Sequence, residues 1–507
     1  MSPDDVFFAE WRARGQGERR SLARARRLLD LLGAPTASAP VLTVVGSKGK
    51  GTTATYASAY LAAAGLRVVS VTSPALRANR ERVRVNGTAI SDASLSALAA
   101  RISKALGSMP DRRESPGYLS PVGLFTIAGI LHARDIEADV IVLEAGMGGA
   151  SDEVSLFPPH TVAITEIFAE HVGVLGDTPA EIAREKAAVT SARTQAVLSL
   201  PQQPAVHQAI TTVLRDRTTR PGKTTRLSTG TALRRDTEPT NDSTDTEASS
   251  PSKTEPMEVP EAEAAKAAEV EAGRVDLETV DLETVDLETV DLETVDLETV
   301  DLETVSAEGG TLPPDLLPPS YGRRNAVLGC AAAARMLSLL NLPLPPPKTL
   351  TDVLASVRLP GRLSFHTLPE SGTKLCVDSA INRAGVATAL TMALRHWPRV
   401  DHVLLCLPDH KDIEGAVTEL AGLPVTFVRL ALPHLRFTAP LPATWTAIDE
   451  SQLTRRLLTE LGPHVLAIGT VYFTGKVLDT INAPTETLFT PPPQPPAPSP
   501  QAPPPPP

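Results

Sequence analysis

The segment Val41-Leu-Thr-Val-Val45, followed by Gly46-Ser-Lys-Gly-Lys-Gly-Thr-Thr53, decides the fold of this 507-residue chain. Five consecutive apolar or β-branched residues predict a buried strand. The glycines that follow predict a tight turn, and the alanine-rich stretch 54–64 predicts a helix. Free N–H groups and the positive dipole end at a helix N-terminus hold anions, and Lys50 adds positive charge. The segment therefore predicts a loop that cradles nucleotide phosphates; the alternative is a tight glycine turn without a ligand.

Strands and helices alternate after this segment. Further strands are expected at residues 67–73, 138–144 and 161–165, and helices at 91–106, 121–135 and 178–190. This alternation predicts a mainly parallel sheet, and the active sites of such sheets lie at the carboxyl ends of the strands. Gly46 and three polar residues stand at or shortly after four of these ends, and we expect them to converge on one crevice above the phosphate loop: Gly46, Ser73, Glu144 and His171.

Three local patterns add detail to this first part of the chain. A basic amphipathic stretch predicts that residues 5–33 are largely helical. Alternating residues that end in Asn86-Gly87 predict a hairpin. Thr178-Pro-Ala-Glu181 is the pattern of a capping box at the start of a helix.

Acidic charge is concentrated in one repeated pentapeptide. Asp-Leu-Glu-Thr-Val occurs six times between Asp276 and Val305, and these copies hold twelve acidic residues. The formal net charge of the chain is −11, which leaves +1 for all other residues. The acidity therefore does not argue against an anionic substrate. A period of five matches neither a helix face nor strand alternation well, so we expect a disordered acidic spacer.

The composition excludes several other classes of protein. The three cysteines, Cys330, Cys376 and Cys406, have no metal-ligand spacing, which is typical of buried thiols in a reducing compartment. The N-terminus lacks a leader pattern, and no apolar stretch reaches the ~20 residues that span a bilayer. Basic residues are scattered and aromatic residues make up 4%, so no nucleic-acid surface is expected. We expect a cytoplasmic monomer without a membrane partner.

The changes of composition along the chain predict two ordered domains. Strands expected at 374–378, 402–407 and 465–469 indicate a second, smaller α/β domain. The proline-rich end cannot form a core, so we expect a disordered tail. The expected divisions are a first domain 1–215, a disordered insert 216–312, a linker and helix 313–345, the second domain 346–483, and the tail 484–507.

The motifs, in their order, resemble the folylpolyglutamate synthase/dihydrofolate synthase family, a branch of the Mur ligase superfamily. The loop fits the G-x-x-G-K-G-[ST] pattern of this family better than the common G-x-x-x-x-G-K-[ST] pattern. The resemblance covers roughly residues 10–200 and 318–480. Its strongest parts are Gly46 to Thr53, Thr72-Ser-Pro74, Val142-Leu-Glu144-Ala-Gly-Met-Gly-Gly149, Ile182-Ala-Arg-Glu-Lys186, Leu359-Pro-Gly-Arg362 and Asp378-Ser-Ala-Ile-Asn382.

The resemblance implies an ATP-dependent ligase with a P-loop, Mur-ligase-like first domain and a smaller Rossmann-like second domain. A carboxylate of a folate-like or pteroate-like acid would attack the γ-phosphate, and the amine of a glutamate-like amino acid would then displace phosphate from the acyl phosphate. ATP would contact Gly46, Gly49, Lys50, Gly51, Thr52, Asn325, Arg362 and Asp378. Mg²⁺ would be held by Ser73, Glu144, His171 and a carbamylated Lys186, and the implied catalytic residues are Lys50, Lys186 and His171.

The chain departs from the family pattern in the part that would bind the acid and the amine. Ala75 and Ile381 replace histidines, Gly123 replaces a glutamate, and Arg383 replaces a proline. Residues 150–155 read Ala-Ser-Asp-Glu-Val-Ser where the family has R-L-D-A-T-N. Three alternatives to a folate ligase therefore stay open: a ligase of the same type with another substrate, a catalytically silent nucleotide-binding relative, and an ATPase whose acidic insert recruits partners.

Overall fold

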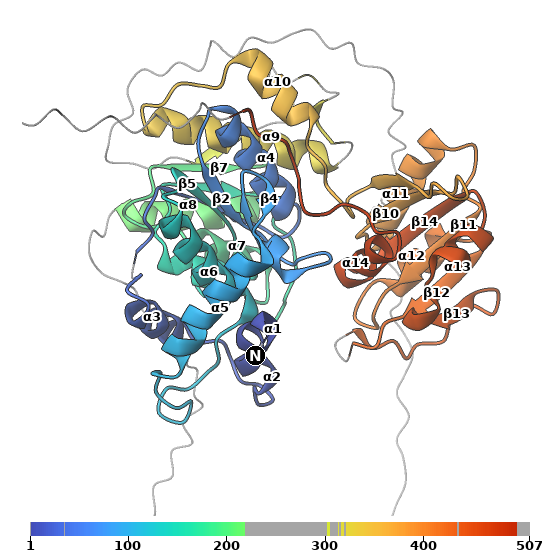
Figure 1. The fold of residues 1–507 in the computed structure, drawn as a ribbon, viewed down its shortest axis with the longest axis horizontal. Helices are drawn as coiled ribbons and strands as arrows, with labels where there is room; N and C mark the ends of the chain where they lie inside the picture. Colours follow the sequence, from blue (N-terminus) through green and yellow to red (C-terminus); the bar gives the residue numbers. More distant parts are fainter. Residues whose placement is uncertain are drawn as a thin grey trace, which may run out of the picture. The chain divides into compact units, whose positions relative to one another are not determined.

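In the computed structural model, the described residues are 2–34, 36–218, 302–304, 313, 316–318, 321–432 and 435–493. They lie in one of the two compact units of the chain, Met1–Pro221 with Val285–Pro507. They form two β-sheets with helices against them (Figure 1). The second unit, Gly222–Thr284, lies outside the described residues.

The first sheet has eight strands in the order β4-β3-β2-β5-β1-β6-β7-β8. β1 lies between β5 and β6, pairs parallel with both, and is buried along its whole length. β2, β7 and β8 continue the parallel arrangement, while β3 and β4 form an antiparallel hairpin at one edge. The strands are β1 (Val41–Val45), β2 (Val68–Val71), β3 (Val83–Val85), β4 (Thr88–Ala89), β5 (Val140–Glu144), β6 (Thr161–Ile164), β7 (Ala196–Ser199) and β8 (Leu302–Thr304).

Helices cover both faces of this sheet, because side chains along each strand alternate between its two faces. On one face, Leu42 and Val44 pack with the apolar residues of α4 and α9. On the other, Val41 and Val45 pack with those of α3, α5 and α6. The helices of this part are α1 (Pro3–Phe7), α2 (Ala9–Arg12), α3 (Leu22–Leu31), α4 (Lys50–Ala63), α5 (Asp92–Leu106), α6 (Pro121–Asp135), α7 (Pro179–Ala187), α8 (Pro204–Thr218), α9 (Tyr321–Leu339) and α10 (Pro347–Ala355).

The second sheet has six strands in the order β13-β12-β11-β14-β10-β9. All neighbouring pairs are parallel except β9 and β10. Two apolar clusters, one on each face, form its core. Its elements are β9 (Ser364–Thr367), β10 (Lys374–Asp378), α11 (Arg383–His396), β11 (His402–Cys406), α12 (Ile413–Glu419), β12 (Val425–Arg429), β13 (Thr446–Asp449), α13 (Arg455–Glu460), β14 (His464–Gly469) and α14 (Val471–Thr480).

The fold class predicted from the sequence is confirmed, as are the strands that carry the polar residues. The hairpin turns at Asn86 and Gly87, both with positive φ, and Thr178 forms the predicted capping box with Glu181. The prediction of a largely helical stretch 5–33 is wrong in part, because α1, α2 and α3 are separate short helices. β7, α8, β9, β12 and β13 were not predicted. No helix of the described residues is long and apolar enough to cross a membrane.

The structure differs from the expected disordered insert 216–312 at both ends. α8 continues to Thr218, and residues Leu302–Thr304 of the last pentapeptide copy form β8. β8 pairs with β7, a strand that the sequence did not predict. The other five copies lie outside the described residues.

The structure also corrects the expected start of the tail at residue 484. Phe489 is 1% exposed and packs against Gly87 of the β-hairpin. The N–H of Leu488 donates to the Gly87 carbonyl at 2.9 Å, and the Thr485 hydroxyl donates to Glu81 at 2.7 Å. The chain therefore returns to the first sheet after α14, while residues 494–507 lie outside the described part.

The contact between α4 and α9 gives a test of the packing. A Cβ on Gly329 of α9 would lie 2.3 Å from the Thr53 carbonyl oxygen and 3.0 Å from the Ala57 nitrogen, and both of these are backbone atoms. Gly-to-Ala in a helix ordinarily stabilises a protein by about 0.5–1 kcal/mol. Here we expect Gly329→Ala to lower the free energy of unfolding by about 1–3 kcal/mol, because the helices must separate. Urea denaturation measures the change.

Ser338→Ala, at an exposed position of the same helix, is the matched control and should leave stability within about 0.5 kcal/mol. A stabilising effect of Gly329→Ala would contradict the close approach of α4 and α9.

Candidate functional site

The phosphate loop, residues 46–53, joins β1 to α4 and depends on two glycines. Gly49 caps α4 with φ of 90°, and a Cβ there would lie 2.2 Å from the side chain of Asn325. Gly46 has φ of 134°, and a Cβ there would lie 1.9 Å from Thr165 Oγ1. L-residues rarely adopt these angles, and both positions lack space for a side chain. The loop is therefore held tightly between β6 and α9.

Lys50 begins α4 and folds back over the loop. Its Nζ donates to the carbonyl oxygens of Gly46 at 2.9 Å and Ser47 at 3.4 Å. The ammonium group thus lies over the loop, and the free N–H groups at the start of α4 point to the same place. Two independent sources of positive potential meet there, and this is the environment that binds phosphate.

Glu144 ends β5 beside the loop and is 6% exposed. Its Oε2 accepts a hydrogen bond of 2.9 Å from the backbone N–H of Ser73. A side chain at Gly51 would lie 3.6 Å from its carboxylate oxygens. Burial raises the pKa of Glu144, and the positive charge of Lys50 opposes this effect. Ser73, Glu144 and the loop are therefore brought together, as predicted.

Lys186 of α7 is 1% exposed, yet it carries an amine. Its Nζ donates to the Gly46 carbonyl at 2.8 Å and forms an ion pair of 2.8 Å with Glu170 Oε1. Burial and the charge of Lys50 lower the pKa of Lys186, while Glu170 raises it. The structure therefore brings Lys186 to the phosphate loop, and its ion pair with Glu170, the residue before His171, was not predicted from the sequence.

His171 follows Glu170 in a strained backbone conformation, with φ of 49°. Its Nε2 lies 4.0 Å from Glu170 Oε2, and its side chain is 47% exposed. Burial lowers the pKa of His171, and Glu170 acts in the opposite direction. The imidazole ring is thus largely neutral at pH 7, and it presents an accessible nitrogen next to the Lys186–Glu170 pair.

The residues present fit Mg²⁺ only together with a nucleotide. Within the described residues, no group of three His, Cys, Asp or Glu side chains could hold a metal ion. Glu144 offers one carboxylate beside the loop, and Ser73, whose backbone N–H donates to that carboxylate, carries a hydroxyl. Mg²⁺ commonly binds one or two protein carboxylates and completes its shell with substrate phosphates and water. Glu144 and Ser73 suit that mode, whereas a protonated Lys186 would repel the ion.

Three further expected ATP contacts come from later parts of the chain. The backbone carbonyl of Asn325, in α9, accepts a hydrogen bond of 2.9 Å from Thr53 Oγ1. Asp378 ends β10 and accepts a bond of 2.7 Å from the Leu363 N–H. Burial raises the pKa of Asp378, and the charges of Arg362 and Lys48 oppose that effect. Asp378 thus interacts electrostatically with a lysine of the phosphate loop.

Glu153 is a buried carboxyl that sequence analysis passed over. It is 1% exposed, and its Oε1 accepts a bond of 2.7 Å from Ser120 Oγ. A Cβ on Gly123 would lie 2.2 Å from its carboxyl carbon. The space that a side chain at residue 123 would fill is therefore occupied by a carboxyl group from residue 153. The two departures from the family pattern, at 123 and 153, form one compensating pair.

The surroundings of Glu153 favour its protonated form. Burial is the largest effect, and the neighbouring Asp152 adds to it, so the pKa of Glu153 rises to about 7. Arg20, 3.5 Å from Glu153 and 3.0 Å from Asp152, opposes this rise. No residue pattern reveals such a group, because an acidic residue in a loop is exposed in most proteins.

The other departures have structural consequences of their own. Ile381 packs its partly buried side chain against the core of the second sheet. The backbone N–H of Arg383 donates to Asp412 at 2.8 Å, a bond that the proline of the family could not form. Asn382 caps α11 through a bond of 3.0 Å from the Gly385 N–H. The strand end at Asp378 is thus followed by a well-formed helix start that lacks the histidine.

Parts of the chain are similar in sequence to known proteins, and its fold is similar to solved structures. No family model matches the chain. A probable bifunctional folylpolyglutamate synthase/dihydropteroate synthase of Haloferax volcanii is 41% identical over 167 residues, which are 33% of this chain and 20% of that protein. The dihydrofolate synthase/folylpolyglutamate synthase of Escherichia coli is 33% identical over 187 residues, which are 37% of this chain and 41% of that protein. The chain thus matches less than half the length of these relatives.

The fold is similar to solved folylpolyglutamate synthases over nearly its whole length. A complex of such a synthase with AMPPCP and folate has a TM-score of 0.65 at 18% identity, covering 95% of this chain and 100% of the other. The Mycobacterium tuberculosis enzyme in complex with ADP and AMPPCP has a TM-score of 0.64 at 19% identity, covering 92% and 96%. The resemblance found in the motifs is confirmed, and so is the fold that it implied.

Because the pKa of Glu153 is raised in the folded protein, we expect the free energy of unfolding to fall as the pH rises. The folded protein binds this proton more tightly than the unfolded chain, whose carboxyl has an ordinary pKa near 4.5. Stability therefore falls as pH rises from about 4.5 to about 7 and stays reduced above. Glu153→Gln should remove this loss, so the variant should be more stable than the native protein above pH 7, by up to roughly 3 kcal/mol.

The measurement is chemical denaturation of both proteins between pH 4.5 and 8. Glu137→Gln, at an exposed position, should leave the pH profile unchanged. Parallel profiles for Glu153→Gln and the native protein would contradict a raised pKa at Glu153.

Proposed function

We propose that this protein is an ATP-dependent ligase that joins a carboxylic acid to an amino acid through an acyl phosphate. The observation that carries the proposal is the phosphate loop with Lys50, Glu144 and Lys186 gathered at the carboxyl ends of parallel strands. This arrangement places the Lys50 ammonium group and a helix N-terminus beside one carboxylate, with the amine of Lys186 close by. It suits the transfer of a phosphoryl group, in which catalysis is mostly positioning and charge stabilisation.

The nucleotide in this proposal is ATP. Solved proteins with the same fold are described as complexes with AMPPCP or ADP, which supports ATP here. The loop residues and Lys50 would hold the phosphates, with Asn325, Arg362 and Asp378 as further contacts. Ser73 and Glu144 would hold Mg²⁺ with the phosphate oxygens. When bound, the ion would neutralise charge on those oxygens.

The acid in this proposal is a folate or pteroate, and the amino acid is L-glutamate. The names of the sequence relatives and the folate complex of a protein with the same fold support this choice. The substrate carboxylate attacks the γ-phosphorus of ATP, so a P–O bond forms and ADP leaves. The neutral amine of glutamate then attacks the acyl carbon, the C–N bond forms, phosphate leaves, and the amine loses its proton.

A second candidate acid, unrelated to folate, has support from specific residues. Ile381 and Ala75 stand where the family has histidines. The family has a glutamate at the position of Gly123, whereas here the carboxyl group in that space belongs to Glu153. These departures lie where the acid and the amine would bind. The ATP-binding residues, by contrast, match the family. A ligase of the same type with a changed acid is therefore the alternative.

We also propose that the protein acts in the cytoplasm as a monomer. The three cysteines are free and buried, as expected of a chain from a reducing compartment. Burial raises the pKa of the Cys330 thiol to about 12, which keeps it unreactive.

The assay for this function uses the full chain with ATP, Mg²⁺, L-glutamate and either dihydropteroate or tetrahydrofolate. We expect phosphate release only when both acid and amine are present, and a product whose mass has grown by one glutamate residue. A panel of other carboxylic acids tests the second candidate. ATP binding without turnover for any acid of the panel would contradict the ligase proposal. Phosphate release in the absence of an acid would indicate an ATPase.

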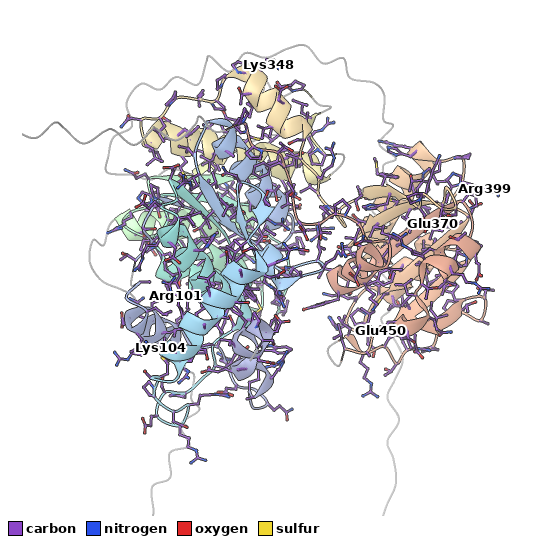
Figure 2. All side chains as sticks on the ribbon, viewed as in Figure 1. Arg101, Lys104, Lys348, Glu370, Arg399 and Glu450 are labelled. Carbon is purple, nitrogen blue, oxygen red and sulfur yellow. The ribbon has the colours of Figure 1, made fainter. Side chains whose placement is uncertain are left out.

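Lys50→Met should lower turnover by about 10²–10³-fold, because it removes a charge that stabilises the transferred phosphoryl group. Circular dichroism and urea denaturation should show a folded protein, since both hydrogen bonds of Lys50 within the described residues go to carbonyls of its own loop. Lys104→Met is the matched control. Lys104 lies on α5, and its side chain projects from the surface (Figure 2), so its loss should leave the rate unchanged.

Lys186 is proposed to react with carbon dioxide. Its lowered pKa increases the fraction of neutral amine, which attacks the carbon of CO₂ to form an N–C bond and releases one proton. The resulting carbamate is an anion that would add an oxygen ligand beside Glu144. Lys186→Arg keeps a buried cation but forms no carbamate, and we expect its ligase activity to fall by at least ~100-fold.

Carbon-13 NMR in labelled bicarbonate gives a readout that does not depend on activity. The native protein should show a carbamate signal and Lys186→Arg should lack it. A native protein without this signal, at any bicarbonate concentration up to saturation, would contradict the modification while leaving the ligase proposal standing.

A further inference from the structure

The eighth strand of the first sheet comes from the repeated pentapeptide. β8 is Leu302–Thr304, inside the last of the six Asp-Leu-Glu-Thr-Val copies. It pairs parallel with β7, with Leu302 opposite Val197 and Thr304 opposite Ser199. The outer edge of β7 therefore takes up a segment from the acidic insert, far from the phosphate loop in the order of strands.

The pentapeptide suits this edge because its side chains alternate. Leu302 is partly buried and packs against the large apolar cluster of the sheet. Glu303 points to the opposite face, where its Oε1 forms an ion pair of 3.1 Å with Arg335 of α9. An apolar residue on one face and an acid on the other are what the edge of β7 requires. The Arg335 side chain is 18% exposed and the Glu303 side chain is 44% exposed, so this ion pair lies at the surface of the sheet edge.

Five other copies in the chain have the same sequence as the one that forms β8. They span residues 276–300 and lie outside the described residues. Because five is an odd number, leucines of successive copies would fall on opposite faces of one continuous strand. A longer strand would therefore turn alternate leucines away from the core. The edge of β7 has a place for one copy at a time.

We propose that the outer edge of β7, together with Arg335, is a strand-addition site that accepts any one of the six copies, and that the copies exchange on it. The recognised segment is an acidic pentapeptide of this chain, with leucine and glutamate in adjacent positions. The backbone pairing gives affinity, while Leu302 and Glu303 give the register. This inference is independent of the ligase proposal.

The lengths of the connecting segments permit the exchange. Moving from the last copy to the first shortens the connection before the strand by 25 residues and lengthens the one after it by the same number. The entropy of closing a loop depends on the logarithm of its length. The populations of the six copies on the edge of β7 should therefore differ by only roughly two-fold, even between the first copy and the last. The number of copies could then vary without loss of the eighth strand.

Hydrogen exchange of the β7 amides that face β8 tests this proposal on the full chain. The first variant carries Leu302→Asp and Glu303→Lys in the last copy alone. The second carries the same two changes in all six copies. If copies replace one another, the first variant should keep its protection within about two-fold, whereas the second should lose about ten-fold or more.

The exchange of β1 amides, which lie inside the sheet, is the internal control for folding and should be the same in all three proteins. Equal loss of β7 protection in both variants would overturn the proposal, because the last copy would then be the sole occupant. Unchanged protection in both would also overturn it, because no copy would then hold the edge.

A charge exchange tests the role of Arg335. Arg335→Glu should reduce protection of β7 with the native repeats, and Glu→Lys at the third position of all six copies should restore it in the Arg335→Glu background. Restoration by a change in any single copy other than the last would directly demonstrate that the site accepts it. Absence of restoration with all six changed would contradict recognition through Arg335.

Discussion

The contacts of the buried, unmodified Lys186 side chain are the interactions that assemble the site before any reaction with carbon dioxide. Lys186 donates to the carbonyl of Gly46 at 2.8 Å and pairs with Glu170 at 2.8 Å, while its side chain is 1% exposed. A charge removed from water must be paired and hydrogen-bonded, and losing one partner of such a pair typically costs about 3–5 kcal/mol. The pair therefore ties α7 and the segment after β6 to the end of β1. Gly46, Lys186 and Glu170 come from three separate parts of the chain.

The close contact of α4 with α9 holds the other side of the phosphate loop. Gly49 lies against the side chain of Asn325, and Gly329 lies against the backbone at Thr53. Thr53 Oγ1 also donates to the Asn325 carbonyl at 2.9 Å. A Cβ at Gly329 would meet backbone atoms, and Gly49 has a φ of 90° that L-residues rarely adopt, so both positions favour glycine. These contacts fix the path of the loop, and a preformed loop favours phosphate binding because little ordering is required.

Much of the first sheet could be predicted from the sequence. The apolar run of β1, the Asn86-Gly87 turn and the Thr178 capping box are local patterns, and each forms as predicted. The positions of Ser73 and Glu144 followed from one general rule, that the carboxyl ends of parallel strands share an edge. Their contact of 2.9 Å follows from β2 and β5 being neighbours in the sheet.

Other features depend on partners that are distant in the chain. The pentapeptide period predicts neither helix nor strand, and β8 forms only because β7 offers an edge and Arg335 a charge. Burial and Asp152 raise the pKa of Glu153, whose carboxyl occupies the space that a side chain at residue 123 would fill. The sequence by itself determined the glycine loop and the alternation of strands and helices around it, because periodicity and glycine positions act over a few residues. Only the tertiary structure decided the partner of Lys186, the place of Glu153 and the eighth strand, because burial and charge pairing depend on which segments meet in space.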